Sequence, residues 1–270
     1  MRAHHIPRGP AFALALLGVA CGGSGTPATV TDQAPEEVLG DSLIGSWLAA
    51  SGGMDAWNDV RSARFTITTV WFDSVGAIRR MRPRRVEMRR ANGVEEARVE
   101  RPEAEGLYVQ TWTGTSSWAT LNDEPMAADT KEVAEAEYVG RDVMYWIGLP
   151  YKLFDPGVNR RARVLDDGGY EVLITFGDDV GVHPGDRYFY YFFDDDPYPE
   201  EVHYIEQGRT EESRNRTVWN GYGRVGDFSY VVARRWLNRE GMPTKELRID
   251  DVQLNPPLSD SLFAAPQVSR

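Results

Sequence analysis

Side chains that alternate with a period of two residues are the feature that most constrains how this chain can fold. The pattern begins at Phe65, Ile67, Thr69 and Trp71, and it returns in many short segments up to residue 254. Gly, Asn or Asp bounds many of these segments, which is typical of antiparallel strands joined by turns. So many strands would expose sheet edges unless they curl. We therefore expect a mainly β protein of the α+β class, with a strongly curved antiparallel sheet or half-barrel.

Two segments have a helical period, one before the alternation begins and one that interrupts it. Residues 35–51 carry large apolar side chains near helical spacing, and Gly52 and Gly53 end the segment. Residues 131–149 form an amphipathic pattern that is stopped by glycine and proline. We expect these helices to cover the concave face of the sheet. Among the strands, residues 78–81 and 84–90 are predicted to be separate, and residues 228–237 to be continuous.

The N-terminus has the order of an export signal. Arg2 and Arg8 precede an apolar run at residues 11–17, and three small residues lead to Cys21, the only cysteine. The run is about half of the roughly 20 residues that cross a bilayer. A cysteine in the first mature position resembles a bacterial lipoprotein signal, so residues 1–20 are predicted to be a signal peptide and Cys21 to be lipidated. Gly18 stands where the usual signal has leucine, which leaves open an ordinary signal with a free Cys21 thiol.

Composition divides the remaining chain into a tether and one domain. Residues 21–38 are rich in small residues and proline, as flexible tethers are. Residues 39–266 are predicted to be a single β domain, because 41% hydrophobic residues, including 8 Trp, 12 Tyr and 10 Phe, supply a sizeable core. The net charge of −11 argues against nucleic acid as a partner, since phosphates would be repelled.

Motifs for catalysis, metals and cofactors are weak. Residues 40–43 spell the Gly-Asp-Ser-Leu of an esterase family, but they lie in a helical pattern and no Asp-x-x-His follows. Three aspartates at residues 194–196 have the chemistry to hold calcium, although the proline that follows favours a solvated hairpin turn. His183 and His203, with a single cysteine, do not make a zinc site. We expect no enzyme activity, no metal and no cofactor.

Aromatic residues are the candidates for a ligand-binding wall. Alternation sends three rings of the run at residues 188–193 to each face, so this strand is expected to be covered on both sides. Ordinary core packing and a ligand wall both stay open for these rings and for the scattered tryptophans. The candidate ligand-binding residues are Trp71, Trp112, Trp118, Trp146, Tyr188, Tyr190, Phe192 and Trp219.

Seven arginines between residues 79 and 90 form a basic cluster in this acidic chain. We expect most of them on a solvated outer face with cross-strand ion pairs. The alternative is a site for an anionic headgroup or a partner protein.

Several segments, in their order, resemble the LolA-like lipoproteins, which include lipoprotein carriers, lipoprotein-sorting relatives and uncharacterised tethered proteins. They include Ser-Gly-Gly-Met-Asp-Ala-Trp at residues 51–57 and Tyr-Lys-Leu-Phe-Asp-Pro-Gly-Val at residues 151–158. Further matches occur at residues 170–176, 184–188, 226–228 and 258–263, so the resemblance covers about residues 40–266. It implies a curved sheet around an apolar cavity and no catalytic residues. The best-known carriers are soluble proteins that shuttle lipoproteins. This chain differs from them because it carries a lipidation signal of its own.

Two hypotheses of function follow. In the first, the chain is an envelope lipoprotein, tethered to the membrane through Cys21, which binds a lipid, an acyl chain or a lipoprotein without catalysis. In the second, the core is filled and the fold presents a surface to a protein partner in the envelope. Gly22 differs from the aspartate that retains lipoproteins at the inner membrane in many bacteria. We therefore expect the outer membrane, facing the periplasm.

Overall fold

The computed structural model describes residues 33–266, apart from residues 92, 179, 182, 194 and 195. The predicted signal peptide, Cys21 and most of the predicted tether lie outside this range. Within it, no helix has both the length and the apolar character needed to span a membrane.

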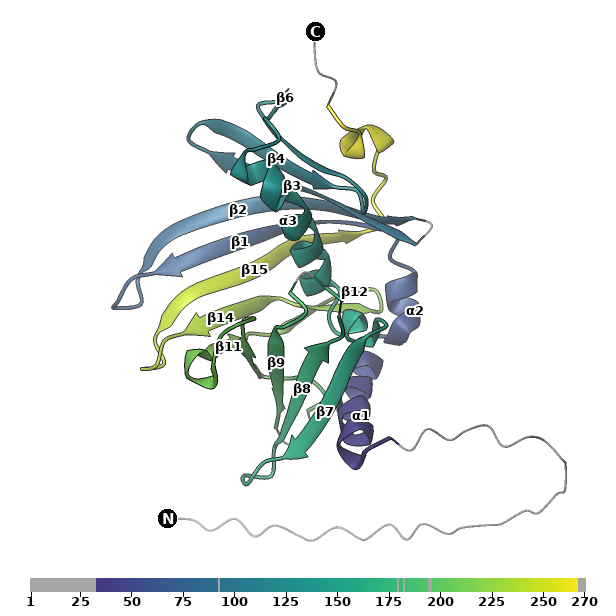
Figure 1. Ribbon diagram of the computed structural model, residues 1–270, viewed down its shortest axis with the longest axis vertical. Coiled ribbons are helices and arrows are strands. Elements are labelled where there is room, and N and C mark those ends of the chain that lie inside the picture. The colour runs from purple at the N-terminus through teal and green to yellow at the C-terminus, as the bar shows by residue number, and fades with distance from the viewer. Residues whose placement is uncertain (1–32, 92, 179, 182, 194–195, 267–270) are drawn as a thin grey trace, which may run out of the picture. The chain divides into compact units, whose positions relative to one another are not determined.

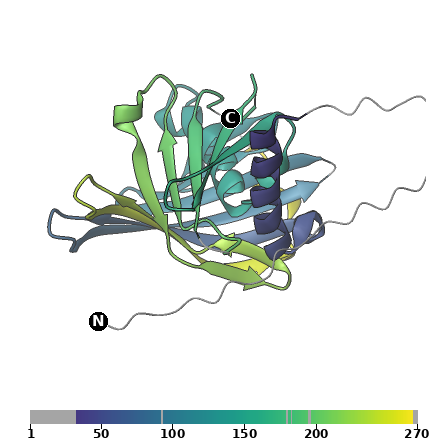
Figure 2. The ribbon, with the colours of Figure 1, turned by 90° about the horizontal axis from the view of Figure 1, so that it is seen from below.

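One antiparallel sheet of thirteen strands dominates the described part of the chain, and it curves so that α1 and α3 lie on its concave side (Figures 1 and 2). The strands, in sheet order, are β6 (Glu124–Pro125), β5 (Ser117–Leu121), β4 (Gly106–Trp112), β3 (Val94–Glu103), β2 (Ile78–Ala91), β1 (Ser62–Phe72), β15 (Pro243–Leu254), β14 (Ala233–Leu237), β11 (Asn215–Trp219), β10 (Glu201–Ile205), β9 (Arg187–Phe192), β8 (Tyr170–Phe176) and β7 (Val158–Val164). The predicted fold class, a mainly β protein with a curved antiparallel sheet and helices on its concave face, is confirmed.

The remaining elements are short or cover the sheet. The helices are α1 (Pro35–Ala50), α2 (Gly53–Asn58) and α3 (Lys131–Ile147), and the 3-10 turns are η1 (Tyr151–Phe154), η2 (Glu211–Ser213) and η3 (Asp260–Phe263). A separate hairpin consists of β12 (Tyr222–Val225) and β13 (Phe228–Val231). Helix α1 therefore begins inside the range predicted as tether, at the residue where the helical pattern starts.

Two predicted strand boundaries are wrong. β2 is continuous through Pro83, which lies opposite Thr68 of β1, whereas pairing with β3 begins only at Arg85. At Pro83, β2 is paired with β1 but not yet with β3. A proline is tolerated there because it does not have to donate a hydrogen bond to a second strand. Residues 228–237 divide at Val232, whose N–H donates to the Gly221 carbonyl of the hairpin while its own carbonyl accepts from Ile249 of the main sheet.

Apolar side chains fill the concave face in two separate clusters. The first lies under α3 and β13, where the Tyr151 ring packs 5.5 Å from Trp57 and 5.3 Å from Phe228, and these two rings lie 6.0 Å from each other. The second lies under α1, where the Trp47 ring is 5.8 Å from Tyr190 and 5.7 Å from the Trp219 ring. Each long helix thus covers its own part of the sheet, which leaves space between the two.

Both long helices approach the sheet at a glycine. Gly40 of α1 lies so close to β7 that a Cβ atom there would be 2.8 Å from the Arg160 carbonyl carbon. Gly140 of α3 lies against β4, where a Cβ atom would be 2.7 Å from the Cβ of Trp112. These approaches set the height of the helices above the sheet.

Alanine at Gly40 is expected to destabilise the fold, although alanine favours helix by about 1 kcal/mol. The added methyl meets β7 backbone, which cannot rotate away, and such overpacking costs about 1–3 kcal/mol. At Gly45 of the same helix a Cβ atom would meet no packed neighbour within 4 Å, so Gly45→Ala should raise stability by about 0.5–1 kcal/mol. Chemical denaturation of both variants provides the comparison. Equal stabilisation by the two alanines would contradict the close packing of α1 on β7.

The basic cluster divides between the two faces of β2. Arg89 follows the expectation, because it lies on the convex face and pairs with Glu96 of β3. Arg82 and Arg84 do not, because they share the concave face with Val86 and Met88, which pack in the first core cluster. The predicted outer-face location is therefore wrong for these two arginines. Burial of the apolar members of the strand turns them inward.

Glu201 on the convex face of β10 makes stability depend on pH. It accepts hydrogen bonds from His203 and from Arg216, whose Nη2 is 2.9 Å from its Oε2. Burial alone raises the pKa of Glu201, but these hydrogen bonds outweigh burial and lower it to about 2. A carboxyl with a lowered folded-state pKa stabilises the fold above its unfolded pKa, and this contribution is lost as the pH falls toward the folded value.

We therefore expect Glu201→Gln to reduce the free energy of unfolding at pH 7 by only about 1 kcal/mol, because Arg216 is exposed and water screens its attraction to Glu201. The difference from the unsubstituted chain should shrink as the pH falls from 4.5, the unfolded value, toward 2. Urea titrations at pH 7 and pH 3 measure it. Exposed Glu200 offers a matched control, since Glu200→Gln should show no such trend. A pH-independent cost of Glu201→Gln would contradict the assignment.

Candidate functional site

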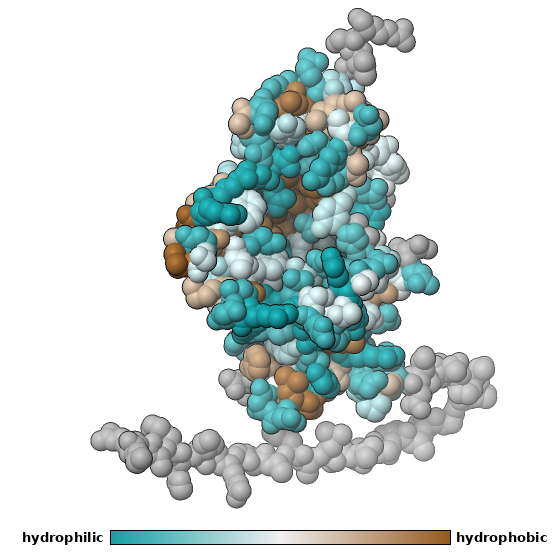
Figure 3. All heavy atoms as spheres, turned by 60° about the vertical axis from the view of Figure 1, so that its left-hand side comes forward, coloured by the Kyte–Doolittle hydropathy of each residue, from teal (hydrophilic) through white to brown (hydrophobic). Residues whose placement is uncertain are grey.

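A cavity of about 980 Å³ opens on the concave side of the sheet, beside α3. Its floor comes from β1, β2, β14 and β15, and its walls come from α3 on one side and from β8, β9 and β10 on the other. Figure 3 shows a hollow in this face of the molecule, with apolar atoms deep inside and hydrophilic residues around its rim. The volume lies in the range of small-molecule sites, which is about 300–1,000 Å³.

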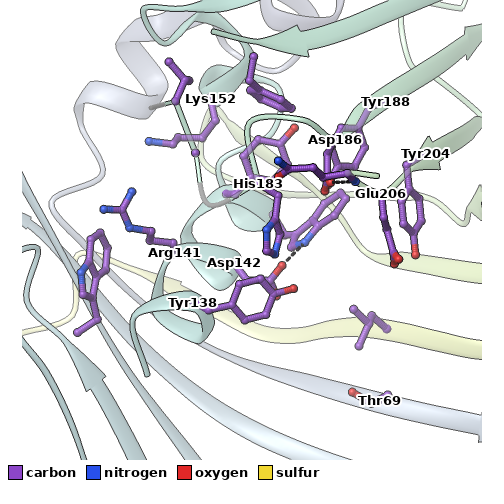
Figure 4. Close-up of a pocket in the computed structure, with 18 of the residues that line it drawn as sticks. Thr69, Tyr138, Arg141, Asp142, Lys152, His183, Asp186, Tyr188, Tyr204 and Glu206 are labelled. Carbon is purple, nitrogen blue, oxygen red and sulfur yellow. Dashed lines mark hydrogen bonds between the residues drawn. The ribbon is translucent and has the colours of Figure 1, made fainter. Parts of the chain in front are cut away.

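One stripe of α3 faces the cavity because helical side chains spaced by three or four residues share a face. The stripe consists of Tyr138, Arg141, Asp142, Tyr145 and Trp146. Figure 4 shows Tyr138 and Asp142 beside His183, which approaches from the segment before β9. The adjoining face of α3 carries its buried residues and packs on the sheet. The amphipathic pattern predicted the helix, but it did not show that part of the polar face turns inward.

The floor of the cavity follows from strand alternation and register. Thr69 of β1 faces the cavity and lies opposite Leu247 of β15. Two residues further along, Trp71 lies opposite Lys245, which in turn lies opposite Trp236 of β14. Directly opposed residues of antiparallel strands share a face. A continuous row of side chains therefore crosses the floor.

Aromatic rings form a connected wall. The Trp146 ring lies 5.2 Å from the Tyr145 ring and 6.2 Å from the Tyr188 ring, and Tyr188 stacks on Tyr204 at 5.7 Å. The Nε1 of Trp236 donates a hydrogen bond of 3.0 Å to the Tyr204 hydroxyl, and Trp146 donates one of 2.7 Å to Asp142. These contacts hold the rings in place, so the wall is formed before any ligand arrives.

The cavity also carries charged side chains, so it is less apolar than the resemblance implies. Several of them are neutralised by close partners: Arg82 Nε lies 2.9 Å from Glu103, and Lys152 Nζ lies 2.7 Å from Asp155 and 3.0 Å from Glu95. Rings and charges together suit a ligand that has both an apolar and a polar part.

Two tyrosine hydroxyls of the cavity are held in their neutral form. Burial raises the pKa of Tyr138 to about 12 and raises that of Tyr188 as well, so both hydroxyls are neutral near pH 7. Ser42 of the esterase-like tetrapeptide is exposed on α1, while His203 lies on the convex face of β10, so the two are not brought together. Within the described residues, no group of three or more His, Cys, Asp or Glu is placed to hold a metal ion.

Half of the predicted ligand-binding residues line the cavity, namely Trp71, Trp112, Trp146 and Tyr188. Three others, Tyr190, Phe192 and Trp219, are at most 6% exposed and lie in the core cluster under α1. Trp118 of β5 lies opposite Thr111, and therefore on the sheet face opposite to Trp112. The eight residues consequently do not form a single site.

Other cavity residues were not among the sequence-predicted ones. The aromatic members of this group are Tyr138, Tyr145, Phe176, Tyr204 and Trp236, and the cationic members include Arg84 and Lys245. Alternation along each strand places Trp236 and Lys245 on a common face once β14 and β15 are paired. The pairing itself joins segments that the sequence pattern does not relate.

The comparisons with known proteins identify the fold. The sequence matches no family model and no curated protein. Solved structures that it resembles include a DUF1329 family protein from Desulfovibrio piger, with a TM-score of 0.52 and 10% identity over 83% of this chain and 97% of that one. A LolA superfamily protein from Nitrosomonas europaea gives a TM-score of 0.50 and 11% identity over 84% of this chain and 97% of that one. At the level of fold, the resemblance noted in the sequence is confirmed.

Proposed function

We propose that this chain, which has the LolA-like fold, is a membrane-tethered envelope lipoprotein that binds an acyl chain of a lipid or lipoprotein in its concave cavity. No bond is made or broken in this function. The observation that carries the proposal is the ring-lined cavity of about 980 Å³ beside α3. A lining of aromatic side chains favours an apolar chain, because each buried methylene contributes about 0.8 kcal/mol.

A cavity-filling variant tests this proposal. Thr69→Trp places an indole in the middle of the floor, and it should weaken the binding of palmitate by at least about tenfold, equivalent to 1.4 kcal/mol. Thr68→Trp is the matched control, because Thr68 is the neighbouring residue on the same strand and faces the convex side. Palmitate binding is measured by tryptophan fluorescence on the full chain with Cys21→Ser, which lacks the predicted lipidation site.

The control should bind palmitate within about twofold of the parent, which corresponds to less than 0.5 kcal/mol. Equal loss of binding in Thr68→Trp and Thr69→Trp would show that the effect is not local to the cavity. A parent chain that retains no lipid after purification and binds no palmitate would contradict the proposal outright.

The tether is tested separately. Cys21→Ser should move the chain from the membrane fraction to the soluble periplasmic fraction, because acyl chains at Cys21 are the proposed anchor. Mass measurement of the native N-terminus should show a diacylglyceryl thioether and an acylated amine. A native chain with an unmodified Cys21 thiol would refute the tether without affecting the cavity.

Exposed apolar residues favour the second candidate, a contact with a protein partner. Val75 and Ile78 at the β1–β2 hairpin are 77% and 54% exposed, and Met242 of the adjacent β14–β15 hairpin is 37% exposed. Such patches often mark interaction sites. Cross-linking in cells should capture one dominant partner if this role holds, and Val75→Ser with Ile78→Ser should abolish that product. Capture of many partners at similar yield would count against it.

A further inference from the structure

Three cations on the concave face remain without an acidic partner. Arg84 of β2, Arg234 of β14 and Lys245 of β15 form no ion pair with any described residue. The Nε of Arg84 and an Nη of Arg234 are buried, and neither atom has a hydrogen-bond partner among the residues that the structure describes. Arg234 is only 4% exposed. Buried guanidinium groups are ordinarily paired, so this arrangement requires an explanation.

The three cations belong to one locality. Arg234 lies opposite Leu247, two residues along β15 from Lys245, so the two cations are diagonal neighbours on one face. Lys245 has its pKa lowered chiefly by burial and then by the charges of Arg234 and Arg84. One acid, Asp142 of α3, acts electrostatically on all three. Asp142 also accepts the hydrogen bond from Trp146, and Glu206, a second acid of the cavity lining, acts on Lys245 alone.

Aromatic rings hold the cations in position without neutralising them. The guanidinium carbon of Arg234 is 3.4 Å from the Trp146 ring centroid, and Lys245 Nζ is 3.8 Å from that of Trp236. Such contacts favour the cation but leave its hydrogen-bond donors free. Burial lowers the pKa of Arg234 to about 10, so its charge is retained at pH 7. Arg234 therefore stays positively charged without a direct acidic partner, inside a protein whose net charge is −11.

From this cluster we infer that the cavity binds an acyl ligand by an oxyanion at its end, which is a carboxylate or a lipid phosphate. Arg84 and Lys245 on the cavity floor are the direct donors, and Arg234 behind Trp146 is a further positive charge. The inference rests on the proposed function and adds the chemical class of the head group. Guanidinium and ammonium groups donate charge-assisted hydrogen bonds to both kinds of oxyanion. The ring wall accommodates the chain, while the cations fix its orientation.

Three probes with the same C16 chain test the inference: palmitate, hexadecyl phosphate and hexadecanol. On the full chain with Cys21→Ser, the two anions should bind about tenfold or more tightly than the alcohol, since charge-assisted bonds are made only to them. The stronger of the two anions identifies carboxylate or phosphate as the natural head group. Equal affinity for hexadecanol and palmitate would overturn the inference and leave the proposed function intact.

Arg84→Met is the decisive variant and Arg82→Met its matched control. Both arginines lie on the same face of β2 and line the cavity, but Arg82 is already paired with Glu103. Arg84→Met should weaken palmitate about tenfold and leave hexadecanol unchanged, whereas Arg82→Met should change neither by more than about twofold. Lys245→Met is the second variant, with the same expectation.

Stability distinguishes a binding role from a structural one. Because an unpaired buried charge is costly, the ligand-free Arg84→Met chain should melt at or above the temperature of the parent. A lower melting temperature with equal loss of palmitate and hexadecanol would show that Arg84 serves packing, which overturns the inference. If the protein binds none of the three C16 probes, the proposed function fails. Inorganic phosphate then tests the cations alone, and the absence of Arg84-dependent phosphate binding would overturn the anion site as well.

Discussion

Trp47→Ala is expected to lower the free energy of unfolding by about 3–5 kcal/mol, as large-to-small changes of buried tryptophan do. Trp47 is completely buried and joins α1 to the sheet through the rings of Tyr190 and Trp219. The surrounding rings belong to β9 and β11, which are held by their own pairing and cannot collapse into the space. The loss is a large part of the 5–15 kcal/mol that stabilises a typical domain.

Two further substitutions sharpen this expectation. Val38→Ala in the same helix alters a side chain that is 53% exposed, and it should leave stability within about 0.5 kcal/mol. Trp47→Phe should cost less than its lost volume suggests, because the Trp47 Nε1 has no hydrogen-bond partner among the described residues. Urea unfolding followed by far-ultraviolet circular dichroism measures all three. A Trp47→Ala chain as stable as Val38→Ala would show that α1 is not anchored at this residue.

Phe228→Ala is the second substitution with a large expected effect, again about 3–5 kcal/mol. Phe228 belongs to the β12–β13 hairpin, which lies outside the main sheet, and its ring stacks against Tyr151 at 5.3 Å. The Tyr151 hydroxyl accepts a hydrogen bond of 3.2 Å from the Ser229 N–H and donates one to the Ser51 carbonyl. Loss of the ring therefore opens a cavity and loosens these buried polar contacts.

The control for Phe228→Ala is Tyr230→Phe in the same strand. The Tyr230 hydroxyl makes no hydrogen bond with the described residues, so its removal should change stability by less than about 0.5 kcal/mol. Thermal unfolding and amide hydrogen exchange of residues 222–231 provide the measurement. Loss of protection in the hairpin alone, at an unchanged melting temperature, would show that the hairpin unfolds independently and does not support the core.

Local patterns predicted the elements of the sheet well because each strand keeps its own alternation. The residues of β2 show that alternation alone does not predict which face of a strand is turned toward the core. Alternation separates Arg82 and Arg84 from Arg85 and Arg89, but it does not say which set faces inward. That choice depended on Val86 and Met88, which share the parity of Arg82 and Arg84 and are buried in the core.

The sequence by itself determined which side chains share a face of a strand and where the two long helices lie along the chain. Only the tertiary structure decided the use of each face. Tyr188, Tyr190 and Phe192 point to the same side of β9, yet Tyr188 lines the cavity whereas the other two are core residues under α1. Alternation is a property of neighbouring residues, whereas coverage by a helix depends on segments more than a hundred residues away. For that reason the face of each aromatic residue could be predicted, but its role as core or cavity wall could not.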